Sequence, residues 1–149
     1  MNRHEKALEI LKKGTVIPAT PLVLDENRKI DEKGIRLLMK YYLNCGVGGI
    51  ATAVHTTQFE IRKPEIALFD PILKIVSEEI DGFEKKNNKV IVKVAGVCGA
   101  AEQAVREAET AKKYGYDAVL LSPGGLNSLS EAELIERTAR VAEIMPVIG

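Results

Sequence analysis

Short apolar segments alternate with amphipathic helical segments along the chain, and this alternation limits the fold more than any other feature. Segments rich in β-branched or small apolar residues begin 33, 41, 28 and 29 residues apart, at Thr15, Gly48, Lys89, Asp117 and Pro146. Between them, apolar residues recur with the spacing of a helix face. This order predicts repeated βα units with parallel, buried strands, whose sequences are continuously apolar. We therefore expect an α/β fold.

Two helix starts can be placed from the residues that favour them. Asp70 is followed by Pro71, and Ser130 is followed at the third position by Glu133. Proline is favoured in the first turn of a helix, and a Ser-x-x-Glu pattern is typical of a capping box. The sequence therefore predicts that one helix is capped by Asp70 and another by Ser130.

Two parallel α/β architectures fit the alternation. A five-stranded doubly wound sheet needs about 150 residues, and a closed (β/α)8 barrel about 250. The doubly wound sheet predicts a glycine-rich phosphate loop after its first strand, but residues 18–31 contain no glycine. The chain also ends on the apolar pair Val147–Ile148 with no helix to cover it. Both observations favour the TIM (β/α)8 barrel family, with the first four βα units and the start of strand 5 present.

Composition excludes several classes of function. Lys and Arg number 21, as do Asp and Glu, so no net charge attracts nucleic acid or a membrane surface. No apolar run approaches the ~20 residues of a membrane span, and the charged N-terminus is unlike a signal peptide. The two cysteines lack metal-ligand spacing. We expect a single cytoplasmic domain over residues 1–149, with a helical lead-in at 1–13 and no metal, cofactor, nucleic-acid or membrane partner.

Polar residues stand where the predicted strands end, which is where parallel α/β proteins bind ligands. The clearest group is His55, Thr56 and Thr57, directly after the apolar segment 48–54. Hydroxyls and backbone N–H groups suit a carboxylate ligand, and a hydroxyl also suits a proton relay. A histidine titrates near neutrality, so His55 is a candidate acid–base group. Alternatively, the two threonines are β-formers that simply end the strand.

Four segments resemble, in the same order, the dihydrodipicolinate synthase/N-acetylneuraminate lyase family. They are residues 14–31, 45–60, 94–105 and 115–125. The most specific match is Thr56–Thr57, which corresponds to the paired-hydroxyl motif of the family. The similarity covers essentially the whole chain from its first segment onward, but only the first half of such a protein.

The resemblance implies a TIM barrel with class I aldolase chemistry on a pyruvate-like 2-keto acid. In this family a lysine on a later strand forms a Schiff base and a tyrosine moves protons. Carried over, the relay role falls on Thr56, and binding of the keto-acid carboxylate, partly through a backbone N–H, falls on Thr57. The resemblance also implies a homo-oligomer. The catalytic lysine is expected beyond residue 149, so these residues alone are expected to be inactive.

Some positions depart from the family pattern. His55 stands where glycine usually precedes the threonines, and Gln58–Phe59 stand where glycine and glutamate usually follow. Gly124–Gly125 replace the paired tyrosines that follow the fourth strand. These differences favour a divergent lyase or aldolase with a different aldehyde partner. The alternative is a non-catalytic half-barrel that associates through its exposed strand edges.

The remaining candidates have structural explanations. Lys93 lies inside a predicted strand and is expected to pair with a carboxylate or to reach solvent, although a desolvated lysine can also act as a nucleophile. Cys45 and Cys98 are expected to be packing residues. His4 is expected to be solvated.

Overall fold

The computed structural model describes residues 1–149 and contains one parallel sheet of four strands. Its strands lie in chain order, β1 (Gly49–Thr52), β2 (Val92–Val97), β3 (Ala118–Leu121) and β4 (Val147–Ile148). Each neighbouring pair is parallel. Consecutive parallel strands in chain order are the arrangement of successive βα units in a barrel wall. The predicted α/β fold is confirmed.

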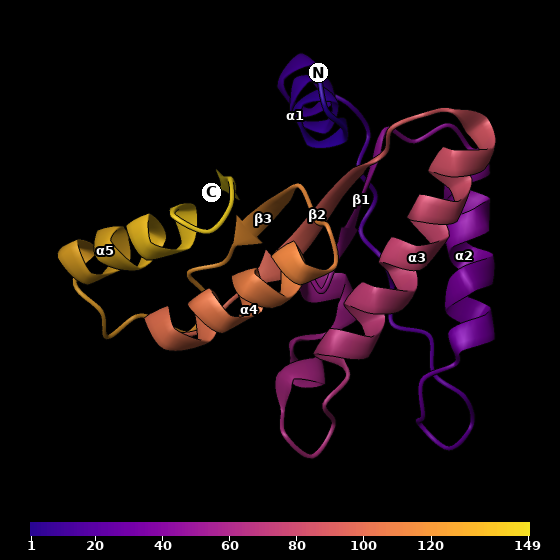
Figure 1. Cartoon of the computed structure of the whole chain (residues 1–149). Helices are drawn as coiled ribbons and strands as arrows, with labels where there is room; N and C mark the ends of the chain where they lie inside the picture. Colours follow the sequence, from indigo (N-terminus) through magenta and orange to yellow (C-terminus); the bar gives the residue numbers. More distant parts are fainter.

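Four helices cover one face of the sheet, and a fifth lies near its amino-terminal end (Figure 1). On the covered face, α2 (Glu32–Asn44) packs beside α3 (Phe69–Asn87), and α4 (Ala101–Lys113) packs beside α5 (Glu131–Ala142). The fifth helix, α1 (Arg3–Lys13), contacts β2. None of these helices combines the length and the apolar character needed to cross a membrane.

The two faces of the sheet carry separate hydrophobic clusters. Because side chains alternate along a strand, β2 contributes to both of them. Ala95 and Val97 belong to the larger cluster beneath the four helices, and Val92 and Val94 belong to a smaller cluster on the opposite face. Ala7 of α1 is fully buried in the smaller cluster. Helix α1 therefore covers part of the face that the other helices leave open.

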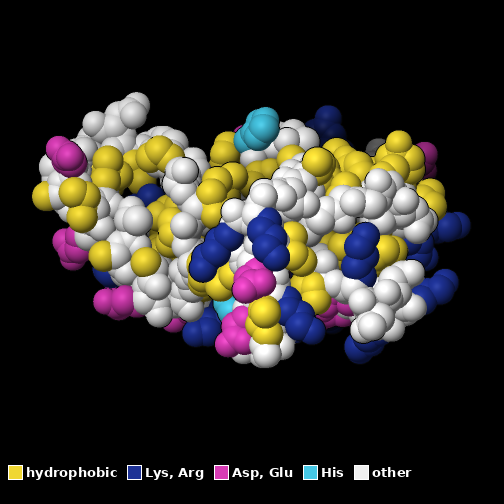
Figure 2. All heavy atoms as spheres, turned by 90° about the horizontal axis from the view of Figure 1, so that it is seen from above, with side chains coloured by type: hydrophobic (Ala, Val, Ile, Leu, Met, Phe, Trp, Pro, Cys, Tyr) yellow, Lys and Arg dark blue, Asp and Glu magenta, His cyan; other side chains and the backbone are white.

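The remainder of that face is only partly covered. Leu120 of β3 is 39% exposed, and Ile17 and Ile148 are half-buried beside the smaller cluster. Seen from above in Figure 2, hydrophobic side chains form a band across the upper half of the view, and most of the Lys, Arg, Asp and Glu side chains lie below it. Leu120, Ile17 and Ile148 thus leave apolar surface on the face of the sheet that α1 covers only in part.

The first predicted strand, residues 15–24, is not a regular strand. The segment runs beside β1 and forms one isolated parallel bridge, between Ala19 and Ala51. The N–H of Ala51 donates to the carbonyl of Pro18, and the N–H of Thr20 donates to the carbonyl of Ala51. Prolines in the segment have no N–H and so interrupt the ladder. The other predicted strands are confirmed with shorter bounds.

One of the two predicted helix starts is confirmed. Ser130 caps α5, and its side chain and that of Glu133 form the reciprocal hydrogen bonds of a capping box. The prediction for Asp70 was wrong, because α3 begins at Phe69 after Leu68, without a side-chain cap. Asp70 lies within the first turn, where its carboxylate accepts a hydrogen bond from the Tyr114 hydroxyl.

Candidate functional site

A pocket of about 180 Å³ lies where β1, β2 and β3 end. Ligands of parallel α/β proteins bind at this edge of the sheet. The lining is mostly apolar and consists of Ala53, Val54, His55, Phe59, Gly96, Val97, Leu120 and Ser122. The only polar side chains in the lining are those of His55 and Ser122. The pocket therefore offers an apolar surface with a few polar groups at its edge, as small-molecule sites commonly do.

The chain leaves β1 through a sharp bend at Ala53. Ala53 has a φ of 61°, in the left-handed region that non-glycine residues seldom adopt. The bend brings the carbonyl of Ala53 so close to Gly96 of β2 that a Cβ at Gly96 would collide with it. Glycine at position 96 is required for this approach. After the bend, the chain forms two short 3-10 helices, η1 (His55–Thr57) and η2 (Phe59–Arg62).

The structure separates the three residues predicted to act at the site. His55 is exposed and lines the pocket, whereas Thr56 is half-buried and Thr57 is fully buried, both outside the lining. The Thr57 hydroxyl donates to the carbonyl of Thr20 at 2.6 Å and accepts from the N–H of Ala53 at 3.1 Å. Thr57 therefore connects the bend after β1 to the segment 15–24, which runs beside β1.

The backbone N–H of Thr57, which was predicted to bind a carboxylate, already has a partner. It donates to the carbonyl of Val54 at 2.9 Å within the turn of η1. A carboxylate would have to replace this hydrogen bond. The role predicted for Thr57 is therefore not formed in this conformation of η1, and it stays a prediction.

Sequence reasoning missed a buried ion pair next to this bend. The guanidinium of Arg62, at the end of η2, contacts Glu107 of α4: its Nε–H donates to both carboxylate oxygens, at 2.9 and 3.0 Å. Both side chains are only 8% exposed. Arg62 also donates to the carbonyls of Ala53 and Gly96, at 2.9 Å each. One side chain thus joins the ends of β1 and β2 to α4.

Glu107 extends the same network to the residue after β2. Its carboxylate accepts from the backbone N–H of Cys98 at 3.1 Å and from the side chain of Gln103 at 2.8 Å. Burial, and then the negative charge of Glu107, raise the pKa of the Cys98 thiol. The burial of Glu107 could have been found from the sequence. Its spacing from Ala104 and Ala111 places it on the same helix face as these two residues, and both are fully buried.

A second buried arginine joins the loops after β2 and β3. Arg137 of α5 donates to the carbonyl of Gly99 and to that of Ser122, each at 2.8 Å. Burial lowers the pKa of Arg137. The pair Gly124–Gly125, which stands where the family has tyrosines, is exposed beyond this contact. No side chain there reaches toward the pocket.

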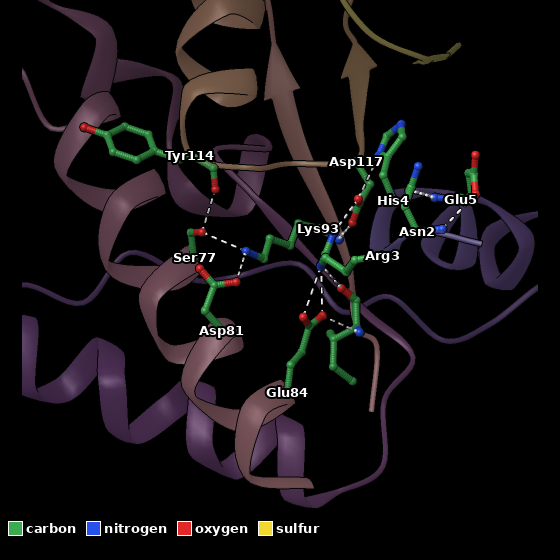
Figure 3. A network of polar contacts seen from close by, with 11 residues as sticks. Asn2, Arg3, His4, Glu5, Ser77, Asp81, Glu84, Lys93, Tyr114 and Asp117 are labelled. Carbon is green, nitrogen blue, oxygen red and sulfur yellow. Dashed lines mark hydrogen bonds and ion pairs between the residues drawn. The ribbon is translucent and has the colours of Figure 1, made fainter. Parts of the chain in front are cut away.

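Lys93 lies away from the site and is fully partnered. Its side chain is 2% exposed, and its ammonium contacts Asp81 at 2.5 Å and the Ser77 hydroxyl at 2.9 Å, both on α3 (Figure 3). The predicted carboxylate pairing of Lys93 is confirmed.

His4 is not merely solvated, contrary to the prediction. Its ring contacts Asp117 at 3.0 Å, and Arg3 contacts the same carboxylate at 2.5 Å (Figure 3). Asp117 is fully buried at the start of β3, and Arg3 also pairs with Glu84. These contacts fix α1 to the amino-terminal end of the sheet, opposite the pocket. No group of three or more His, Cys, Asp or Glu side chains is placed to hold a metal ion.

The sequence matches a lyase among characterised proteins. No family model matches the chain. N-acetylneuraminate lyase 2 of Escherichia coli O6:H1 is 29% identical over 104 residues, which make up 70% of this chain and 32% of that protein. The chain therefore spans well under half the length of the curated relative that it matches.

Solved structures share the fold over a larger part of the chain. Dihydrodipicolinate synthase from Oceanobacillus iheyensis aligns with 98% of this chain and 45% of its own, with a TM-score of 0.75 and 20% identity. N-acetylneuraminate lyase from Fusobacterium nucleatum aligns with 88% of this chain and 43% of its own, with a TM-score of 0.73 and 16% identity. The chain is thus similar to members of the dihydrodipicolinate synthase/N-acetylneuraminate lyase family in sequence and in fold. The predicted resemblance is confirmed.

The dihydrodipicolinate synthase fold also explains the open sheet. Residues 15–24 followed by β1, β2, β3 and β4 correspond to the first four βα units of a TIM barrel and the start of strand 5. The predicted fold class is thus confirmed, since the aligned region is about 45% of the synthase chain.

Proposed function

We propose that these residues form the amino-terminal, substrate-facing part of a lyase or aldolase that acts on a pyruvate-like 2-keto acid through a Schiff base. The observation that carries the proposal is the placement of Thr56–Thr57 in η1, directly after β1 and its bend, in a chain whose curated relative is an N-acetylneuraminate lyase. A further protein of the same fold, the prophage protein YagE from Escherichia coli K12, was solved in complex with pyruvate, with a TM-score of 0.75 and 20% identity.

The roles of the three strand-end residues follow from their exposure. Thr56 is half-buried, so its hydroxyl can pass a proton between a substrate and a second hydroxyl group. His55 is exposed at the pocket and is the candidate for an additional acid–base group. Thr57 would bind the substrate carboxylate through its N–H once the hydrogen bond to Val54 is exchanged.

The amine nucleophile of the proposed reaction is assigned to a lysine outside these 149 residues. The amine attacks the ketone carbon of the 2-keto acid, and water leaves as the C=N bond forms. Lys93 is unsuited to this step, because its ammonium is buried against Asp81 and Ser77 beneath α3, away from the pocket. We also assign the complete protein to a homo-oligomer, as the family resemblance implies, and to the cytoplasm, as the composition predicts.

Borohydride trapping with pyruvate tests the reaction. Borohydride reduces the C=N bond to a stable secondary amine, which mass spectrometry locates on one lysine. We expect an adduct on the complete protein at a lysine outside residues 1–149, and none on the 149-residue chain. An adduct on Lys93 would overturn its structural assignment, and a complete protein without any adduct would overturn the Schiff-base proposal.

The second candidate function is a non-catalytic half-barrel that associates with another chain. The outer edge of β4 and the segment 15–24 each border only one strand of the sheet, so their outer backbone groups have no sheet partner. This candidate predicts self-association and no trapped adduct.

A further inference from the structure

We propose that Arg62 and Glu107 are positioning residues that hold the bend after β1 and thereby fix where His55 and Thr56 stand. Neither residue lines the pocket, so neither is a catalytic residue. The consequence for turnover rests on the proposed lyase function, but the effect on the bend does not.

The bend depends on side-chain hydrogen bonds because Ala53 is strained. A residue with a φ of 61° persists only where its surroundings impose that conformation. Both backbone groups of Ala53 are bound by side chains: the N–H donates to the Thr57 hydroxyl at 3.1 Å, and the carbonyl accepts from Arg62 at 2.9 Å. Arg62 and Thr57 therefore secure the strained residue from its two sides.

The guanidinium also fixes the distance between two strand ends. One nitrogen of Arg62, Nη2, donates to the carbonyls of Ala53 and Gly96, each at 2.9 Å. The same two residues make the close backbone approach that only glycine at position 96 permits. A single planar group thus holds two carbonyl oxygens that would otherwise repel each other. A lysine carries the same charge but has a single side-chain nitrogen, so it cannot contact the two carbonyls and Glu107 from separate nitrogens as Arg62 does.

Glu107 sets the orientation of that guanidinium. Its two oxygens accept from Nε of Arg62, and the ring of Phe69 lies 4.8 Å from the guanidinium carbon. Nη1 of Arg62 is buried without a hydrogen-bond partner, so the arginine is held by its other nitrogens and by the aromatic contact. Because Glu107 also accepts from the N–H of Cys98, its loss would release the ends of both β1 and β2.

Two conservative variants and one control test the proposal. Arg62→Lys keeps the charge, but its single nitrogen cannot contact both carbonyls and Glu107 at the same time. Glu107→Gln keeps the shape but removes the negative charge that the Nε–H of Arg62 contacts. The matched control is Arg36→Lys, because Arg36 pairs with Glu32, Glu78 and Glu79 between α2 and α3, outside the pocket lining. Amide hydrogen exchange, followed by NMR on the 149-residue chain, reports each site separately.

The expected result is a local change. Exchange of the Thr57 and Cys98 amides should rise about tenfold or more in both variants. The bend before η1 and the end of β2 lose charge-assisted contacts of Arg62 and Glu107, so both amides should open to solvent more often. Exchange at Ile35, a buried residue of α2, should stay as in the wild type, and Arg36→Lys should change neither Thr57 nor Cys98. An equal rise at all amides would show a general stabilising role and overturn the proposal. Unchanged exchange at Thr57 would overturn it as well.

The complete protein gives the second readout. If the wild type forms the borohydride-trapped adduct, Arg62→Lys should lower kcat more than it raises KM, because Thr56 and His55 are displaced without loss of a substrate contact. A rise in KM with unchanged kcat would contradict positioning of the relay. If the wild type forms no adduct, the lyase proposal fails, and the exchange experiment alone still decides whether Arg62 and Glu107 hold the bend.

Discussion

Gln58 adopts a φ of 77° and a ψ of 133°, backbone angles that glycine reaches readily and other residues rarely adopt. It directly follows Thr57, at the position where the related family usually has glycine. The residue links η1 to η2 and so helps to set the direction in which the chain leaves the site. The family glycine thus has a physical explanation here, and this chain has replaced it at a cost in backbone strain.

The first prediction is that Gln58→Gly stabilises the protein. Relief of the left-handed strain exceeds the extra entropy of glycine in the unfolded chain, so the free energy of unfolding should rise by about 1 kcal/mol. Urea unfolding measures the change. The control is Gln58→Ala, which keeps the strain and should give no gain. A Gln58→Gly variant less stable than the wild type would show that this turn is not strained.

The second prediction separates the two threonines. Thr57→Val leaves the carbonyl of Thr20 and the N–H of Ala53 buried without their partner, so it should lower the free energy of unfolding by about 2–3 kcal/mol. Thr56→Val removes a half-buried hydroxyl and should leave stability nearly unchanged. In the complete protein, Thr56→Val should lower turnover by roughly 10²–10⁴-fold, as for a lost acid–base group.

Thermal unfolding and steady-state kinetics of both variants check this second prediction. Equal stability of Thr57→Val and the wild type would contradict the connecting role of Thr57. Unchanged turnover in Thr56→Val, with a lower melting temperature, would show that Thr56 serves the fold and not the reaction.

Among the site residues, those close together in the sequence could be predicted and the others could not. The group His55–Thr57 stands after an apolar run, and a local pattern is enough to place it at a strand end. Arg62 and Glu107 meet across 45 residues, and their contact exists only once α4 packs against η2. No spacing rule joins two such positions. The engagement of the Thr57 N–H was equally hidden, because it depends on the 3-10 turn.

At the scale of elements, the helix starts show which local signals are sufficient. The capping box of α5 was predictable because Ser130 and Glu133 satisfy each other's backbone N–H groups without help from the rest of the fold. Asp70 was misplaced because tertiary contacts decide its role: its carboxylate accepts from the Tyr114 hydroxyl at 2.6 Å. The first strand failed for a local reason that the sequence did contain, namely its prolines.

The third prediction concerns α5. Ser130→Ala removes the cap and should lower the free energy of unfolding by about 1 kcal/mol. Hydrogen bonds from Ser130 lower the pKa of Glu133 below its ordinary value of 4.5. Because the folded value is the lower one, this stabilisation is present above pH 4.5 and is lost as the pH falls through the folded pKa.

Chemical unfolding at neutral and at acid pH tests the third prediction. The stability difference between the wild type and Ser130→Ala should shrink as the pH falls below the ordinary glutamate value. The nearby control is Glu136→Gln, which changes an exposed carboxylate of the same helix that takes no part in the capping box. A difference that stays constant down to acid pH would contradict the role of Glu133 in the cap.

At the scale of the whole molecule, the four strands of the sheet and the segment 15–24 beside β1 occupy five successive strand positions of a barrel wall. Both edges of this wall are open. The apolar face opposite the four helices is covered only where α1 lies, and Arg3 and His4 hold that helix in place through Asp117. The rhythm of βα units made this architecture predictable, because parallel strands need their crossover helices at regular intervals. The docking of α1 was not predictable, since Asp117 becomes buried only when β3 enters the sheet.

The last prediction is that the 149-residue chain self-associates. Leu120 is 39% exposed on the open face, and the edges at β4 and at residues 15–24 carry unpaired backbone groups. Apolar surface and open edges both favour contact with a second chain. The sedimentation coefficient should therefore rise with protein concentration.

Leu120→Lys places a charge on the open face and should shift the equilibrium toward the monomer, whereas Leu37→Lys, on the exposed side of α2, should not. A wild-type monomer that is independent of concentration and unfolds cooperatively would show that the open face and edges are stable in water, and the half-barrel interpretation would then be wrong.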